Sequence, residues 1–141
     1  DNNEIVALAG KTVADGIVAA ARETAATTDI SATCAYTQSG TTGSLVARER
    51  PRVPIIALSS EERTLRRLCL TWGTHCVLTP SLERFKQAVV NAAKAARDFG
   101  FADETDQIVV MAGVPFNMPG TTNILRIAPC DERLIYRTDP E

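Results

Sequence analysis

The chain has 141 residues, of which 45% are hydrophobic, 23% are charged and 5% are aromatic, and its formal net charge is −2. This composition is typical of one soluble globular domain that is large enough to bury a core of its own. The weak net charge argues against nucleic acid or an acidic membrane surface as a partner, and no stretch approaches the roughly 20 apolar residues that cross a bilayer.

The chain begins with an acidic, polar segment at residues 1–3, without methionine and without the pattern of a signal peptide. Helical periodicity is already under way by Glu4. We therefore interpret residues 1–141 as a single domain that is a piece of a longer protein.

The four cysteines, Cys34, Cys69, Cys76 and Cys130, form no C-x-x-C pair and have no metal-ligand spacing. Cys34 and Cys69 lie in apolar contexts, where free cysteine behaves as a small hydrophobic residue. We interpret all four as reduced thiols of a cytoplasmic protein. A metal site built from His75 and Cys76 is disfavoured, because neighbouring residues on a strand point to opposite faces.

The first third of the chain predicts a helix, a strand and a loop. A helical period covers residues 4–27, and the residues that it places on one face are Ile5, Leu8, Ala9, Thr12, Val13, Gly16, Ile17, Ala20 and Ala21. A short β-prone run then covers residues 31–36 and leads into a loop rich in small polar residues.

The middle of the chain alternates between helix and strand. Ser59 and Glu62 have the spacing of a capping box, which places a helix start at Ser59. The predicted elements are a helix over 42–49, a strand over 55–58, a helix over 59–70 and a strand over 75–78.

The last part of the chain predicts one long helix followed by strands. Thr79 is placed as an N-cap with Pro80 in the first turn, and Gly100 is placed to end the helix. The predicted elements are a helix over 81–99, a buried strand over 108–111, a last strand over 123–128 and a short strand over 134–136. The tail over 129–141 carries charges of both signs, and we expect it to become ordered only at an interface.

Strands that alternate with helices predict an α/β domain with a mainly parallel sheet. We expect a three-layer αβα arrangement around five strands, with antiparallel pairing confined to the last strand or strands at the sheet edge. Because aromatic residues are few, the core must consist of Ala, Val, Ile and Leu, with helix faces of small residues packed closely on the sheet.

Two loops that combine glycine with short hydroxyl side chains are the candidate binding segments. One spans residues 37–44 between a strand and a helix, and the other spans 113–123 between two β-rich runs. Both are dense in backbone N–H groups, a pattern typical of phosphate binding at the carboxyl ends of parallel strands. A purely structural alternative is that Thr42 caps the helix, Gly40 makes the turn and the second loop only routes the chain.

The residues offer little for catalysis. There is one histidine, no G-x-S-x-G motif and no GxxxxGK[ST] motif. Asp103, Glu104 and Asp106 cluster in a polar turn that predicts a solvated surface, and Trp72 with Gly73 predicts a packing anchor and a turn. We expect no catalytic residue and no metal site, so the chain is interpreted as a binding and regulatory domain.

Several runs, read in order, resemble the C-terminal domain of pyruvate kinases, and the resemblance covers about residues 4–128. The runs are Ala19-Ala20-Ala21-Arg22, Thr37-Gln38-Ser39-Gly40, Arg52-Val53-Pro54-Ile55-Ile56-Ala57, Arg66-Arg67-Leu68, Leu70-Thr71-Trp72-Gly73, Val109-Val110-Met111-Ala112-Gly113-Val114-Pro115 and Pro119-Gly120-Thr121-Thr122-Asn123. Any one run alone would be a weak signal, whereas the ordered set is specific.

The resemblance implies a parent enzyme that transfers phosphate from phosphoenolpyruvate to ADP, giving pyruvate and ATP, in glycolysis. That reaction uses Mg²⁺ and often K⁺ in an upstream barrel domain, and nothing in this chain resembles the barrel. The chain is therefore expected to hold no cofactor and to be inactive alone. In the family, the C-terminal domain binds allosteric sugar phosphates or nucleotides and forms an interface of a homotetramer.

Carried over by position, the family's effector site falls on two sets of residues, between loops 37–44 and 115–123. Two departures concern charge: Thr41 stands where a basic residue is common, and Ala88 stands near the position of an arginine that binds a second phosphate. The resemblance then implies a sugar monophosphate or AMP rather than fructose 1,6-bisphosphate. The site residues implied are Thr37, Gln38, Ser39, Gly40, Thr41, Thr42, Asn117, Met118, Pro119, Gly120, Thr121 and Thr122.

Two other interpretations stay open. In one, the effector site is vestigial and the domain is a pure assembly module that self-associates but ignores phosphate ligands. In the other, the chain is a free-standing, flavodoxin-like binding protein, and the ordered motifs are a coincidence.

Overall fold

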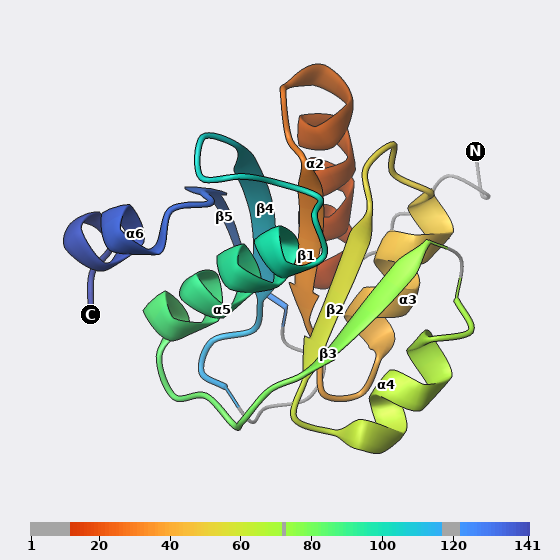
Figure 1. The fold of residues 1–141 in the computed structure, drawn as a ribbon. Helices are drawn as coiled ribbons and strands as arrows, with labels where there is room; N and C mark the ends of the chain where they lie inside the picture. The colour runs from red at the N-terminus through yellow and green to blue at the C-terminus, as the bar shows by residue number, and fades with distance from the viewer. Residues whose placement is uncertain (1–11, 72, 117–121) are drawn as a thin grey trace.

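The computed structural model describes residues 12–71, 73–116 and 122–141. Helices and strands alternate along most of the chain (Figure 1). In chain order the elements are α2 (Val13–Thr27), β1 (Ala32–Tyr36), α3 (Thr41–Glu49), β2 (Ile55–Ser59), α4 (Glu62–Leu68), β3 (Thr74–Leu78), α5 (Phe85–Asp98), β4 (Gln107–Ala112), β5 (Ile124–Pro129) and α6 (Glu132–Thr138).

The sheet has five strands in the order β3-β2-β1-β4-β5. The pairs β3–β2, β2–β1 and β1–β4 are parallel, and only the edge strand β5 runs antiparallel to its neighbour β4. The α/β class, the mainly parallel sheet and the antiparallel edge strand that the sequence predicted are thus confirmed.

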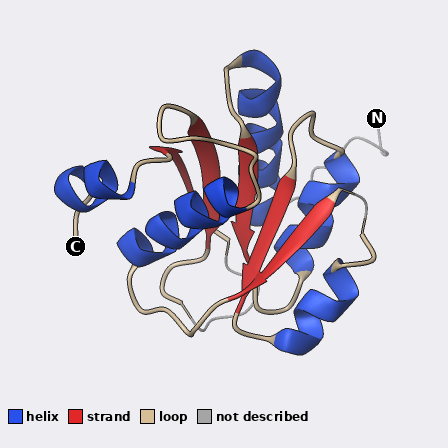
Figure 2. Cartoon of the chain, viewed as in Figure 1, coloured by secondary structure: helices blue, strands red, loops and turns tan. Residues whose placement is uncertain are grey.

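Helices cover both faces of the sheet, which gives three layers (Figure 2). One face carries α5 and α6, whose buried residues pack with Cys34, Ile56 and Val110. The other face carries α2 and α3, which pack with Ala35 and Val109. The small-residue helix face expected from the sequence lies on α5, where Ala88, Ala92, Ala93 and Ala96 are fully buried.

The helix α2 begins later than the periodicity predicted. Thr12 has an extended backbone and caps the helix, and its hydroxyl and the Asp15 carboxylate form a capping box. A continuous helix over 4–27 is therefore wrong at Thr12, while residues 4–11 lie outside the described part. The predicted inner face is confirmed at Ala21 but wrong at Val13, which is 68% exposed, and at Gly16 and Ala20, which are also exposed. The buried residues of the helix are Ala14, Val18, Ala21 and Ala25.

The predicted helix start at Ser59 and the predicted N-cap at Thr79 are wrong for one shared reason. Both residues belong to the end of the sheet: Ser59 pairs with Leu78 in the β2–β3 ladder, and the Thr79 N–H donates to the Ser59 carbonyl over 2.9 Å. The Ser59 hydroxyl accepts from the Glu61 N–H at 3.0 Å, and α4 starts only at Glu62. Ladder hydrogen bonds thus replace the helix caps.

The long helix α5 starts at Phe85 rather than at residue 81, but it ends as predicted. Gly100 has a φ of +78°, its N–H donates to the Arg97 carbonyl, and the Phe101 N–H donates to the Ala96 carbonyl. This pattern is a Schellman motif, which requires a left-handed residue that glycine adopts without strain.

The C-terminal tail folds within the chain itself, so both the predicted strand over 134–136 and the expectation of order only at an interface are wrong. Asp131 caps α6 by accepting from the N–H groups of the next turn, and Ile135 is fully buried. Several ion pairs connect the tail to the rest of the domain. Among them, Arg97 binds Glu132, and Arg126 binds Asp139 at 2.6 Å.

All four cysteines are free thiols. Burial raises the pKa of Cys130 to about 11 and raises that of Cys34 further, so both stay protonated and weakly nucleophilic at neutral pH. Cys69 is exposed, which corrects its predicted apolar setting. Within the part of the chain that the structure describes, no helix is long and apolar enough to cross a membrane.

A matched pair of valine substitutions tests this core. Val109 on β4 is fully buried and Val13 is 68% exposed. We expect Val109→Ala to lower the free energy of unfolding by about 2 kcal/mol, because it removes two buried methyl groups. Val13→Ala should change it by less than about 0.5 kcal/mol. Urea denaturation measures both, and equal losses would contradict the assignment of the core.

Candidate functional site

Both candidate loops start at the carboxyl ends of strands that are neighbours in the sheet. The first follows β1 and the second follows β4, and these strands are parallel neighbours, with Ala35 opposite Met111 near their carboxyl ends. From these ends the chain runs through α3 toward β2 on one side and through the second loop toward β5 on the other. Such a divergence at the carboxyl ends of parallel strands is where open α/β sheets bind ligands.

A buried pair of hydroxyl groups joins the two loops. Thr42 and Thr122, separated by 80 positions, are hydrogen-bonded through their side chains, and each is only 5% exposed. The rings of Tyr36 and Phe116 meet edge to face nearby, with centroids 6.4 Å apart. The structure thus brings together residues of both predicted segments.

Five of the predicted site residues belong to the middle of the second loop. Asn117, Met118, Pro119, Gly120 and Thr121 lie outside the described residues. The described part of the candidate site consists of the first loop, Thr122 and the described ends of the second loop.

Hydrogen bonds of Thr37 fix the backbone of the first loop. The Gly40 N–H donates to the Thr37 hydroxyl at 2.8 Å, and the Thr37 N–H donates to the Leu58 carbonyl at 3.0 Å. Gly40 itself is the N-cap residue of α3, with a φ of +90° and no side-chain cap. Thr42 lies inside the first turn, so the alternative in which it only caps the helix is wrong.

The helix α4 holds the other side of this loop. The Thr64 hydroxyl donates to the Gln38 carbonyl at 2.5 Å, and the Arg67 guanidinium donates to the Ser39 carbonyl at 3.0 Å. The carbonyl and N–H groups of a planar trans peptide point in opposite directions. The N–H groups of Ser39 and Gly40 are therefore turned away from α4.

Gly40 is required by this packing. A Cβ atom at position 40 would lie 3.3 Å from Cγ2 of Thr64, and the left-handed backbone is strained for other residues. The side chain of a substituted residue would thus point at α4. At position 43, a Cβ atom would lie 3.0 Å from Cδ1 of Leu68, which shows how closely α3 and α4 approach.

The described ends of the second loop are clamped by Asn123. Its side-chain amide donates to the Val114 carbonyl at 2.8 Å and accepts from the Val114 N–H at 2.9 Å. The Asn123 N–H donates to the Ala112 carbonyl at 3.0 Å. These bonds set the path of the loop as it leaves β4 and returns to β5.

Sequence reasoning missed three residues at the site: Thr64 and Arg67, which bind the first loop, and Tyr36, whose ring contacts Phe116 of the second loop. Thr64 and Arg67 are three positions apart on α4, a spacing that places them on one helix face, but nothing in the sequence pairs that face with the loop. Burial raises the pKa of Tyr36 well above its usual range, and the nearby Asn91 side chain partly offsets the shift. Among the described residues, the Tyr36 hydroxyl has no hydrogen bond of normal geometry.

Other sequence candidates have structural roles. The Asp103 carboxylate accepts from the N–H and hydroxyl of Thr105, which lowers the pKa of Asp103 and stabilises the turn. The His75 ring packs against Phe101, with centroids 4.8 Å apart, while the Cys76 thiol donates to a carbonyl of α4. The described ranges contain no group of three side chains suited to a metal ion, and Trp72 lies outside them.

The parallel sheet, the glycine-bearing loop before α3 and the second loop beside it define an α/β domain of the doubly wound class. The sequence profile of the pyruvate kinase alpha/beta domain matches residues 15–128, and the chain belongs to that family.

Similar proteins extend this result. The chain is 46% identical over 93 residues to a pyruvate kinase of Agrobacterium vitis, a match that covers 66% of this chain and 20% of that protein. It is 38% identical over 117 residues to a pyruvate kinase of Methylorubrum extorquens, covering 83% and 24%. In fold it is similar to a Cryptosporidium parvum pyruvate kinase in complex with ADP, with a TM-score of 0.77, 24% identity and coverage of 85% and 24%. The chain thus spans only about a quarter or less of the proteins it matches.

A double-mutant cycle tests the contact between the loops. Thr42→Val leaves the buried Thr122 hydroxyl without this partner, so the free energy of unfolding should fall by about 1–3 kcal/mol. Thr122→Val should cost a similar amount. The double variant should lose little more than either single variant, because both remove the same bond. Fully additive losses in urea denaturation would show that the two hydroxyls do not interact.

Proposed function

We propose that this chain is the effector-binding and assembly domain of a pyruvate kinase, and that a phosphorylated metabolite binds between loops 37–44 and 115–123. The observation that carries the proposal is the buried Thr42–Thr122 contact at the carboxyl edge of β1 and β4. It supports a single site made from both loops rather than two unrelated turns.

The chemistry of the first loop supports phosphate as the bound group. The N-terminus of α3 contributes backbone N–H groups and the positive end of the helix dipole, and its first turn contains no acidic residue. Short hydroxyl side chains, Ser39 and Thr42 among them, can add donors to phosphate oxygens.

The charge of the site favours one phosphate over two. Position 41 is threonine, and position 88 is an alanine of α5 that is fully buried in the core, so neither position supplies a cation for a second phosphate. We therefore propose a sugar monophosphate or AMP as the effector rather than fructose 1,6-bisphosphate.

The parent protein would catalyse phosphate transfer from phosphoenolpyruvate to ADP in the cytoplasm, as part of glycolysis. Mg²⁺ and K⁺ would act in the catalytic barrel, and the parent would be a homotetramer. These proposals rest on family membership, and they assign no catalytic residue and no cofactor to this chain.

Assembly alone, with a vestigial effector site, is the second candidate. It is favoured by the two edge strands of the sheet, where Leu78 on β3 is 59% exposed and Ile127 on β5 is 37% exposed. Exposed apolar residues on edge strands are common contact points between chains.

Thermal unfolding with a ligand panel separates the two candidates. The panel is fructose 1,6-bisphosphate, glucose 6-phosphate, ribose 5-phosphate, AMP and inorganic phosphate. A monophosphate present at 100 times its dissociation constant should add about 2.7 kcal/mol of stability and raise the unfolding midpoint by several degrees. The shift should shrink in Thr42→Val and persist in the control Thr27→Val, whose side chain is exposed on α2.

A panel in which no ligand shifts the unfolding midpoint also distinguishes the two candidates. If no ligand shifts the midpoint and sedimentation shows self-association, the assembly module is correct. A chain that stays monomeric at high concentration and binds no ligand would contradict both candidates.

A further inference from the structure

The helices α3 and α4 flank an open pocket of about 480 Å³ on the opposite side of the first loop from Thr122. The loop contributes Ser39 and Gly40, α3 contributes Ser44 and Arg48, and α4 contributes Thr64 and Arg67. Pockets that hold small metabolites have volumes of about 300–1,000 Å³, so this one is large enough for more than a single inorganic ion.

The pocket is positively charged although the chain is not. Among the described residues that line it, two are arginines and none carries a carboxylate, whereas the whole chain has a net charge of −2. The nearest acidic side chains along α3 and α4 are engaged elsewhere: Glu49 pairs with Arg22 at 3.5 Å and Glu62 pairs with Arg66 at 2.9 Å.

The two lining arginines differ in their contacts. Arg67 donates one hydrogen bond, to the Ser39 carbonyl, and a guanidinium carries five N–H donors. Arg48 has no hydrogen bond or ion pair to any residue in the described ranges. Both therefore retain donors for a ligand, and the planar guanidinium matches the oxygen atoms of a phosphate group.

We propose that this pocket is a second anion site, which binds the phosphate group of a small phosphomonoester through Arg48 and Arg67. The hydroxyl groups of Ser44 and Thr71 line the same pocket and are suited to the polar remainder of such a molecule. This site is separate from the one between the loops. The proposed ligand lies between the first loop and α4, whereas the other site lies on the opposite side of the first loop.

Nuclear magnetic resonance of the arginine side chains tests the proposal directly. Inorganic phosphate is titrated at low ionic strength, where screening is weak, with sodium chloride at matched ionic strength as the control. We expect saturable shifts of the Arg48 and Arg67 Nε–H signals with phosphate and none with chloride.

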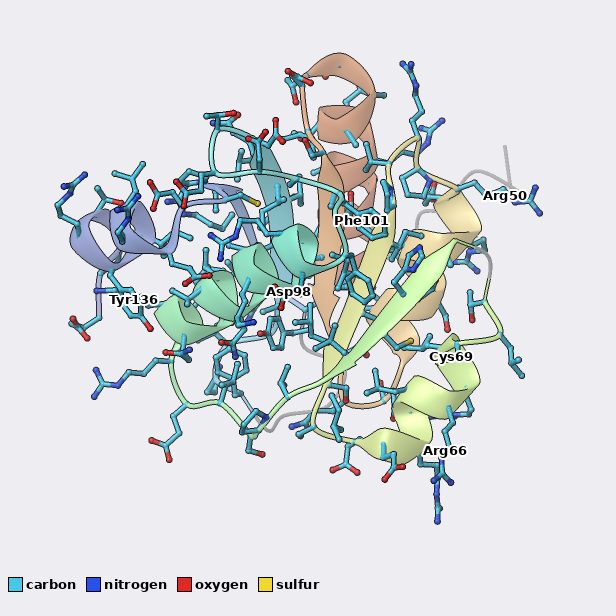
Figure 3. The ribbon with its side chains drawn as sticks, in the orientation of Figure 1. Arg50, Arg66, Cys69, Asp98, Phe101 and Tyr136 are labelled. Carbon is cyan, nitrogen blue, oxygen red and sulfur yellow. The ribbon has the colours of Figure 1, made fainter. Side chains whose placement is uncertain are left out.

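Three variants assign the effect. Arg48→Ala should weaken phosphate binding at the pocket at least tenfold, and it breaks no contact of the first loop. Arg66→Ala is the matched control. It also removes one arginine charge, but from a side chain of α4 that projects into solvent (Figure 3), so phosphate binding should stay within twofold. Thr42→Val, which alters the site between the loops, should leave the Arg48 response unchanged.

The outcomes separate this site from the one between the loops. Arginine shifts that never saturate, or that chloride reproduces, would overturn the proposal and leave only general ionic attraction. Phosphate binding that Thr42→Val abolishes and Arg48→Ala spares would also overturn it, while supporting the site between the loops.

Discussion

The parallel pairing of β1 with β4 is the constraint on which the candidate site depends. It places the carboxyl ends of two strands, which are far apart in the sequence, side by side at one edge of the sheet. The loops that follow the two strands therefore begin side by side, and the Thr42–Thr122 hydrogen bond joins them. Without that register, the two hydroxyl-rich segments would be ordinary turns.

Hydrophobic patterning was sufficient to predict the fold class. The strand runs are almost continuously apolar, as expected for strands buried on both faces, and β1, β2 and β4 are indeed buried. The end of α5 was equally predictable, because Gly100 ends the helix as its position suggested. The two loops were identifiable because glycine and hydroxyl residues concentrate there between periodic segments.

The errors lie where tertiary contacts outweigh local preference. Ser59 and Thr79 have good capping chemistry, but ladder hydrogen bonds between β2 and β3 use their backbone groups. The segment over 134–136 is β-prone in isolation, yet the Asp131 cap and the ion pair between Arg97 and Glu132 stabilise a helix there. The helix α4 holds the first loop because Thr64 and Arg67 donate hydrogen bonds to loop carbonyls that are 26 and 28 positions away in the sequence. No local pattern encodes such contacts.

A crystal structure of the chain with bound AMP would show whether both loops form one phosphate site. If they do, the phosphate lies within hydrogen-bonding distance of the first turn of α3, beside the Thr42 and Thr122 hydroxyls. A phosphate bound away from both threonines, with their mutual hydrogen bond intact, would contradict a site formed by both loops.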